Sequence, residues 1–474
     1  MKTIPHWIGG RPVAEAGAGV SPVFDPATGE QPGEVLLAGR GEVDAAVRGA
    51  AAAFERWSQA PLSRRTAVLF AFRQLVHERT DELAALVSAE HGKVLADARA
   101  EVQRGLEVVE FACGIPHLLK GDYSDSAATD VDAFSFREPL GVVAGITPFN
   151  FPVMVPMWMH PLAIACGNAF ILKPSERAPS ASLRIAELWA EAGLPEGVFT
   201  VVNGDRTAVD ALLDHPGVAA VSFVGSTPVA RHVHRRASAA GKRVQALGGA
   251  KNHAVVLPDA DLDGAADHLL AAAFGSAGER CMAISAAVAV GGIADELAQT
   301  LRDRARRVVV GPGNDPASEM GPVITAAARD RIVGLVTTAE HEGGELVVDG
   351  RGLRVPGHEK GFFVGPSVVD RVRPDMTVYR EEVFGPVLAV LTFRTPEEAV
   401  LRANNSPYGL SAGVWTEKGS RILWMADRLQ AGVVWANTFN RFDPASPFGG
   451  YKESGFGREG GRQGLAAYVK DAAL

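Results

Sequence analysis

The segment LGVVAGITPFNFPVMVPMWMHPLAIACGNAFILK, residues 140–173, decides the architecture of this chain. It contains two short apolar runs, Val142–Ile146 and Ala169–Leu172, which we expect to be buried strands. Two more such runs follow at Val198–Val202 and Ala219–Val224, and helical patterns such as Ser182–Ala192 separate them. Strands that alternate with helices at this spacing predict a parallel sheet covered on both faces.

A second alternation of the same kind follows and contains Cys281. Its expected strands and helices are Ala254–Leu257, Leu262–Ala273, Ala286–Val290, Glu296–Arg307, Ala326–Glu342 and Glu345–Val348. This pattern predicts a second α/β domain. The chain from Phe442 to Gly464 is dense in glycine and proline and is expected to form loops, with Leu465–Val469 as a possible last strand.

The segments before residue 140 are of two kinds. The opening as far as Gly33 is expected to be rich in strands. Amphipathic, alanine-rich patterns then predict helices at Val43–Trp57, Arg64–Arg79, Asp81–Glu90 and Ala96–Phe111. Between this helical layer and the first strand, Gly121–Pro139 is polar and then alternating, so it is expected to leave the domain as one or two strands.

Length, charge and cysteine content limit the class of protein. A chain of 474 residues is expected to form two or three domains. Its 47 Lys and Arg against 55 Asp and Glu give a net charge of −8, which offers no reason to expect binding to nucleic acid or to a membrane. The three cysteines show no metal or disulfide spacing, and the start MKTIPHWIGG has no signal-peptide pattern. We therefore expect a cytoplasmic protein without a metal site.

Cys281 lies in FGSAGERCMAIS, residues 274–285, among small residues and directly after Glu279 and Arg280. Small residues leave a thiol uncrowded, and a cationic neighbour favours the nucleophilic thiolate. The alternative is a small buried hydrophobic residue, the commoner role of a free cysteine. This stretch alone leaves both possibilities open.

Phe223–Pro228, FVGSTP, is the best candidate for a phosphate site, because a strand ends, Gly225 turns the chain and Thr227 can cap a helix with Pro228 in its first turn. A helix N-terminus of this kind attracts a pyrophosphate, although most such starts bind nothing. The literal GxGxxG of Gly455, Gly457 and Gly460 lies in a loop region without room for a βαβ unit, so it is not a dinucleotide motif.

Polar residues also follow two of the expected strands. Asn150 stands between two prolines after the first, and Lys173 and Glu176 follow the second. Ligands bind at the carboxyl ends of parallel strands, where an amide can stabilise an oxyanion and a glutamate can accept a bond from a ribose hydroxyl. The alternatives are a turn-forming asparagine and a surface ion pair.

Seven motifs together resemble the NAD(P)-dependent aldehyde dehydrogenase superfamily: TPFNFP, LKPSE, FVGST, LGG, GERCMA, EEVFGPV and PFGGYKESGFGRE. The resemblance covers nearly the whole chain in the family's order. It implies an α/β fold with a Rossmann-type NAD-binding domain (residues 1–120 and 139–248) and a catalytic domain (249–450). A small β oligomerisation element (121–138 and 451–474) would complete a homodimer or homotetramer.

The resemblance also implies a role for particular residues. Cys281 is the nucleophile, and Asn150 and the Cys281 backbone N–H form the oxyanion hole. The residues implied to bind the cofactor are Thr147, Phe149, Lys173, Glu176, Gly225, Ser226, Glu382 and Phe384. The thiolate would add to an aldehyde, and the adduct would give hydride to NAD and leave a thioester.

Ala246 departs from the family pattern, because water-using members have at this position the glutamate that activates water. Its absence favours deacylation by coenzyme A, whose thiol needs less help than water. Surrounding motifs resemble the CoA-acylating methylmalonate semialdehyde dehydrogenases, in which two arginines bind the substrate carboxylate, here Arg104 and Arg280. That branch yields propionyl-CoA or acetyl-CoA. The chain after Asn404 instead resembles water-using members, with Glu459 as an alternative base.

Overall fold

The computed structural model describes residues 1–474. Its larger sheet contains the strands that the sequence predicts at Val142–Ile146 and Ala169–Leu172. That sheet has eight strands, of which β8–β12 run parallel along the chain's first alternation. In spatial order they are β22 (Gly455–Phe456), β12 (Arg243–Leu247), β11 (Val218–Val224), β8 (Val142–Ile146), β9 (Ala169–Lys173), β10 (Phe199–Val201), β2 (His6–Ile8) and β3 (Arg11–Val13).

Helices cover both faces of this sheet, as the two-sided apolar strands require. Side chains of β8 alternate between two cores: Val143 belongs to a cluster of 104 buried residues, and Ala144 to one of 22. The helices of this domain are α1 (Arg40–Trp57), α2 (Leu62–Glu78), α3 (Thr80–His91), α4 (Leu95–Cys113), α5 (Ile115–Leu118), α6 (Met154–Ala165), α7 (Ser180–Glu191), α8 (Arg206–Asp214) and α9 (Thr227–Ala239). Of these, α1, α8 and α9 supply the smaller core.

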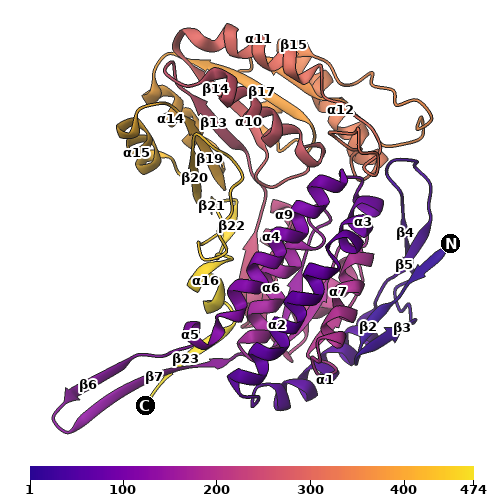
Figure 1. Ribbon diagram of the computed structural model, residues 1–474, viewed down its shortest axis with the longest axis vertical. Coiled ribbons are helices and arrows are strands. Elements are labelled where there is room, and N and C mark those ends of the chain that lie inside the picture. The colour runs from indigo at the N-terminus through magenta and orange to yellow at the C-terminus, as the bar shows by residue number, and fades with distance from the viewer.

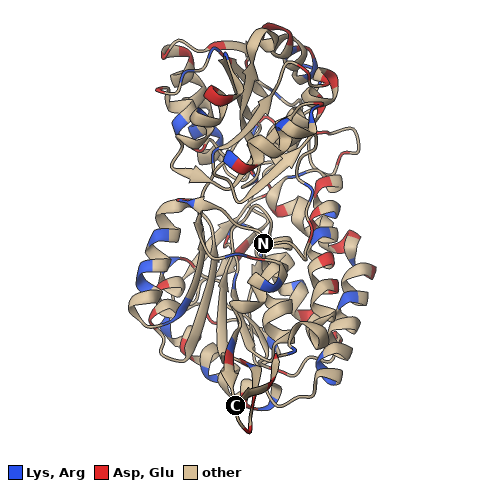
Figure 2. Cartoon of the chain, turned by 90° about the vertical axis from the view of Figure 1, so that its left-hand side faces the viewer, with Lys and Arg blue, Asp and Glu red and all other residues tan.

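The second domain lies beyond this one, as the two lobes of Figure 2 show. Its seven-stranded sheet runs β15 (Glu345–Val348), β16 (Ser367–Asp370), β17 (Val387–Phe393), β14 (Ile284–Val290), β13 (Asn252–Val256), β19 (Ser411–Trp415) and β20 (Val433–Ala436). Its helices are α10 (Leu262–Phe274), α11 (Ala294–Ala305), α12 (Ala326–His341), α13 (Thr377–Arg380), α14 (Pro396–Asn404) and α15 (Gly419–Arg428). The larger core contains residues of both domains.

Three smaller strand groups complete the fold. The hairpin of β6 (Tyr123–Ala128) and β7 (Val131–Pro139) projects from the body and pairs with β23 (Val469–Ala473), so the C-terminus lies beside it (Figure 1). The other groups are β1 (Lys2–Ile4), β5 (Gly33–Leu36) and β4 (Val20–Val23), and the pair of β18 (Tyr408–Gly409) and β21 (Tyr451–Lys452). No helix has the length and apolar character needed to cross a membrane.

Two expectations for the C-terminus need correction. Leu465–Val469 is not a strand: α16 (Gly461–Ala466) ends there, and the last strand is β23. Only β23 of residues 451–474 joins the projecting hairpin, because β22 pairs with β12 at the edge of the larger sheet and β21 pairs with β18. The segment therefore adds an edge strand to the larger sheet before it reaches the small sheet.

Candidate active site

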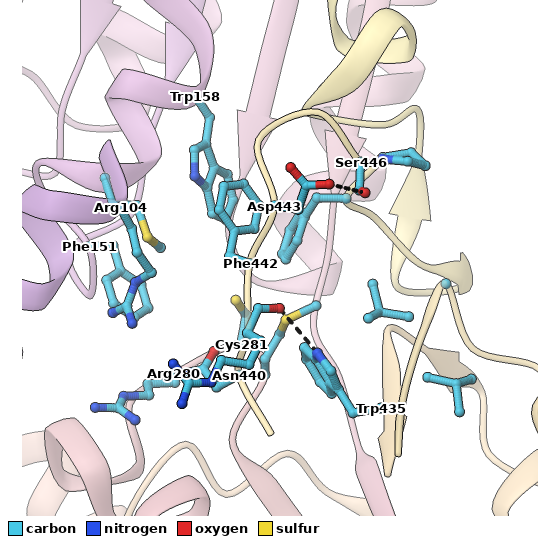
Figure 3. A pocket seen from close by; sticks show the side chains of 18 residues that line it. Arg104, Phe151, Trp158, Arg280, Cys281, Trp435, Asn440, Phe442, Asp443 and Ser446 are labelled. Atoms are coloured by element: carbon cyan, nitrogen blue, oxygen red, sulfur yellow. Dashed lines mark hydrogen bonds between the residues drawn. The ribbon is translucent and has the colours of Figure 1, made fainter. Parts of the chain in front are cut away.

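Cys281 opens onto a cavity of about 390 Å³ between the two domains (Figure 3). Arg104 on α4 and Phe151, Met154 and Trp158 on or beside α6 form one wall. Strand β20, with Trp435, and the loop after it form the other wall, to which the loop contributes Asn440, Arg441, Phe442, Asp443, Ser446 and Phe448. Most of these side chains are apolar or aromatic, and the lining also includes Arg104, Arg280 and Arg441, so the cavity suits a small molecule with an anionic group.

The turn before Cys281 is fixed by a few specific contacts. Ser276 and Ala277 have φ of 51° and 52°, unusual for residues with a side chain. Asp97 on α4 accepts bonds from both the backbone N–H and the hydroxyl of Ser276, at 2.8 and 3.2 Å. At Gly278 a Cβ atom would lie 2.1 Å from the Gly385 carbonyl oxygen, so only glycine fits. After the turn, Asn252 Nδ2 donates to the Cys281 carbonyl at 2.8 Å.

The thiol of Cys281 does not have the lowered pKa expected from its cationic neighbour. Burial, and then the negative charge of Glu382, raise the pKa of Cys281 to about 12. Arg280 is instead turned toward Asp97, with Nη2 2.8 Å from Oδ1. Of the arginines, Arg104 is the one whose charge lowers the Cys281 pKa, and it does so weakly. The thiol is therefore protonated at neutral pH in this structure.

Asn150 lies in the loop before α6, with its side-chain amide aimed at the turn of Cys281. Its Nδ2 donates to the Glu279 carbonyl at 3.0 Å, and the side chain is buried. An amide nitrogen carries two hydrogens, so this bond leaves one hydrogen for another acceptor. The structure thus brings Asn150 and the Cys281 segment together.

Both predicted carboxylate arginines, Arg104 and Arg280, line the Cys281 cavity, but their surroundings differ. Arg104 makes no ion pair and lies over the Phe151 ring at 5.9 Å. Burial and the charge of Arg280 lower the pKa of Arg104. Arg280 is paired with Asp97, whose pKa is lowered because Arg280 and its other partners outweigh the effect of burial. Sequence reasoning missed Arg441, Asp443 and Asp97, because no local motif marks them.

A second cavity of about 560 Å³ lies at the carboxyl ends of β8, β9 and β11. It brings together Thr147, Phe149, Lys173, Glu176, Gly225 and Ser226, six of the eight residues expected to bind the cofactor. Lys173 Nζ lies 3.4 Å from Glu176 Oε2. Burial lowers the pKa of Lys173, and Glu176 opposes that shift. A basic group and an acidic group thus lie side by side where a ribose could bind both.

The remaining two expected residues, Glu382 and Phe384, belong to the second domain. Phe384 packs edge-on against Phe149, with ring centroids 6.0 Å apart, so it reaches the first domain. Glu382 accepts a bond from the Ala250 N–H at 3.0 Å, and burial raises its pKa to about 7. Glu382 is also close enough to act on the Cys281 pKa. Phe384 therefore adjoins the second cavity through Phe149, and Glu382 lies near the thiol.

The cap of α9 differs from the expectation. Ser226, not Thr227, occupies the position before the helix, and Thr227 is its first residue. The Thr227 hydroxyl accepts from the Gly249 N–H at 2.9 Å and so ties α9 to the loop after β12. Neither side chain caps the helix, so its first N–H groups lack a side-chain partner, and Ser226, Pro228 and Val229 at this helix start line the 560 Å³ cavity.

Glu459, the alternative base, is not among the residues that line the Cys281 cavity. Its carboxylate accepts from Ser222 Oγ at 2.8 Å and from the Gln245 amide, and burial raises its pKa to about 8. Its backbone pairs with that of Phe448, a cavity residue. Glu459 is thus held behind the cavity wall with its carboxyl group directed to the larger sheet.

These features belong to a two-domain α/β enzyme that has a cysteine pocket beside a second cavity at the strand ends. The model of the aldehyde dehydrogenase family matches residues 13–473, so the chain belongs to this family.

Similar proteins agree over the full length of the chain. Malonate-semialdehyde dehydrogenase of Pseudomonas aeruginosa is 49% identical, covering 100% of this chain and 96% of its own. Malonate-semialdehyde dehydrogenase 3 of Geobacillus kaustophilus is 48% identical, covering 99% and 97%. The crystal structure of methylmalonate-semialdehyde dehydrogenase from Oceanimonas doudoroffii superposes with a TM-score of 0.99 at 48% identity, covering 100% and 98%. A structure from Sinorhizobium meliloti 1021 in complex with NAD gives 0.99 at 47%, covering 100% and 97%.

Proposed function

We propose that this chain is an NAD-dependent, CoA-acylating dehydrogenase of malonate or methylmalonate semialdehyde, which releases acetyl-CoA or propionyl-CoA and carbon dioxide. The observation that carries the proposal is one cavity that holds the Cys281 thiol together with Arg104 and Arg280. An aldehyde carbon can meet the thiol there while the substrate's carboxylate binds a guanidinium fork. Relatives named for malonate semialdehyde, at 49% and 48% identity, support the substrate class.

The second cavity supports NAD as the cofactor. The uncapped start of α9, Gly225 and Ser226 suit a pyrophosphate, and the Lys173–Glu176 pair suits an adenosine ribose. Thr147 and Phe149, together with Glu382 and Phe384 across the domain boundary, would enclose the nicotinamide end. NAD, when bound there, accepts hydride from the substrate carbon.

The roles of the chain's own residues follow from their positions. Cys281 as thiolate adds to the aldehyde carbon and keeps the acyl group as a thioester. The free amide hydrogen of Asn150 and the Cys281 N–H would stabilise the oxyanion. Arg104, which makes no ion pair, would hold the carboxylate that later leaves as carbon dioxide. Burial and the charge of Glu382 raise the pKa of Cys281 to about 12, so the thiol has to lose its proton before or as it adds to the aldehyde.

Ala246 supports CoA rather than water as the final acceptor. It is buried in β12 and carries no group that could take a proton. Glu459, the alternative base of a water-using enzyme, has its carboxyl group bonded to Ser222 and Gln245 behind the cavity wall. Hydrolysis of the thioester would therefore lack base assistance, which is typically worth about 10²–10⁴-fold.

The test is rapid mixing of enzyme, NAD and methylmalonate semialdehyde, with and without CoA. We expect a burst of about one NADH per active site, then a slow steady state that CoA accelerates. Ala246→Glu should raise the CoA-independent rate, and Glu459→Gln should leave the wild-type rate unchanged. Fast turnover with no burst and no effect of CoA would replace this proposal by a water-using aldehyde dehydrogenase.

The proposal extends to assembly and location. The projecting hairpin exposes Tyr123, Val131, Phe134 and Phe136, so we propose that it joins copies of the chain into a homodimer or homotetramer. Three free cysteines suit the reducing cytoplasm. Light scattering of the purified protein measures the oligomer directly, and a monomeric mass would contradict this part.

A further inference from the structure

Behind the Asn150 loop lies a buried ion pair that touches neither cavity. Lys93, in the turn between α3 and α4, places its Nζ 2.7 Å from Glu101 Oε2 on α4. Both side chains are fully buried. A buried charge pair is costly unless further bonds satisfy it, so its other partners are informative.

Those other partners all belong to the segment that carries Asn150. Lys93 Nζ donates to the Asn150 backbone carbonyl at 2.6 Å. Glu101 Oε1 accepts from the backbone N–H groups of Val153 and Met154, at 2.8 and 3.2 Å. The pair thus holds both ends of residues 150–154. Lys93 bonds to Asn150, which has the proposed oxyanion role, and Glu101 bonds to the residues at the start of α6.

The ammonium group makes one more contact with the same segment. Lys93 Nζ lies 4.3 Å from the centre of the Phe151 ring. Phe151 itself lines the Cys281 cavity. Since the Asn150 amide donates to the Glu279 carbonyl at 3.0 Å, two residues before the thiol, displacement of the Asn150 backbone would move the amide relative to the thiol.

We infer that Lys93 and Glu101 are positioning residues that fix the Asn150 amide against the Cys281 turn. The inference rests on the proposed role of Asn150 in the oxyanion hole. A rigid, buried lock suits that role, because a stabilising donor works only at a fixed position, and a misplacement of about 1 Å can cost about 10²-fold in rate.

Two reactions of the same thiol separate positioning from general damage. Acylation by p-nitrophenyl acetate passes through an oxyanion. The acylation rate is measured as the rate of the initial burst of p-nitrophenolate. Alkylation by iodoacetamide forms none. Removing one charge of a buried pair leaves the other uncompensated, so the test variant is Lys93→Met/Glu101→Gln, which keeps an oxygen acceptor for the α6 N–H groups.

The reference variant is Asn150→Ala. The matched control is Lys242→Met, because Lys242 is also largely buried and donates to two backbone carbonyls, those of His215 and Val218 at 2.5 and 2.7 Å, at the opposite end of β11. If the double methionine–glutamine variant is not recovered folded, Lys93→Gln/Glu101→Gln replaces it, since two amides can still bond to each other.

We expect the burst to slow roughly 10- to 100-fold in the double variant and about 10²–10³-fold in Asn150→Ala, with alkylation changed less than about threefold in both. Lys242→Met should change neither rate. If the burst is normal in the double variant but slow in Asn150→Ala, the inference about Lys93 and Glu101 is wrong and the proposed function is unaffected. Equal loss of burst and alkylation in the double variant would also overturn it. A normal burst in Asn150→Ala would instead remove the oxyanion role on which the proposed function relies.

Discussion

Oδ1 of Asp97 lies 2.8 Å from Nη2 of Arg280, and its other oxygen accepts both bonds from Ser276 in the turn before Cys281. Arg280 is therefore part of the support of the nucleophile's turn, while Arg104 makes no ion pair. The two arginines of one cavity thus have different surroundings and should respond differently to substitution.

Arg104→Met should raise KM for methylmalonate semialdehyde by roughly 10- to 100-fold, the value of a charge-assisted bond of about 1.5–3 kcal/mol. Its kcat/KM for an uncharged aldehyde such as propionaldehyde should stay close to that of the wild type. Arg280→Met and Asp97→Asn should instead lower kcat for both aldehydes, because the turn at Ser276 loses its brace. Steady-state kinetics with the two substrates distinguish these outcomes. An equal effect of Arg104→Met on both aldehydes would contradict the carboxylate role.

Cys281→Ala should abolish hydride transfer while NAD binding, measured by calorimetry, stays intact. Cys113→Ala and Cys166→Ala are the matched controls, since both thiols are buried and away from the Cys281 cavity. Turnover of even a few per cent in Cys281→Ala would remove the nucleophile assignment.

The pH dependence of Cys281 follows from its raised pKa of about 12. In enzyme without cofactor, only the small thiolate fraction reacts. As long as the pH is below the pKa, this fraction grows about tenfold for each unit by which the pH rises. The iodoacetamide rate should therefore rise from pH 7 to pH 10 without a plateau. A plateau below pH 8 would show that the thiol is already ionised.

Glu176 should favour NAD over NADP, because a carboxylate next to the adenosine ribose repels a 2′-phosphate. Glu176→Gln keeps the hydrogen-bond acceptor and removes the charge, so it should narrow the difference in kcat/KM between the two cofactors. Arg177 and Arg206 line the same cavity and attract phosphate. They therefore oppose the preference for NAD, which depends on Glu176 alone. Equal use of both cofactors by the wild type would mean that Glu176 does not face the ribose.

Glu459→Gln should stabilise the protein at high pH. Burial raises the folded-state pKa of Glu459 from 4.5 to about 8. The folded protein thus holds a proton that the unfolded chain has lost, and stability falls as pH rises from about 4.5 to 8. Glutamine resembles the protonated acid, so the variant and the wild type should have similar melting temperatures at pH 5. At pH 9 the variant should melt at a higher temperature, because its free energy of unfolding is larger by on the order of 1 kcal/mol or more. A lower melting temperature at pH 9 would contradict this sign.

The sequence alone predicts the parallel strands and the helices of the first domain, together with the polar residues that follow those strands. The runs at Val142–Ile146 and Ala219–Val224 coincide with β8 and β11, apart from one residue at the start of β11, because apolar runs bounded by glycine and proline have few alternatives. The resemblance of the motifs to the aldehyde dehydrogenase family indicates Cys281 and Asn150 as site residues, and the alanine at 246 favours a thiol acceptor.

The surroundings of those groups follow from the folded chain and not from local sequence. Asp97 and Arg280 are 183 positions apart, and Lys93 is 57 positions from the Asn150 carbonyl that it holds. Arg280 directly precedes the thiol in the sequence, where a cationic neighbour favours a thiolate, but the folded chain turns Arg280 to Asp97 and buries the sulfur. Charge and burial depend on distances between remote segments, which local sequence patterns do not contain.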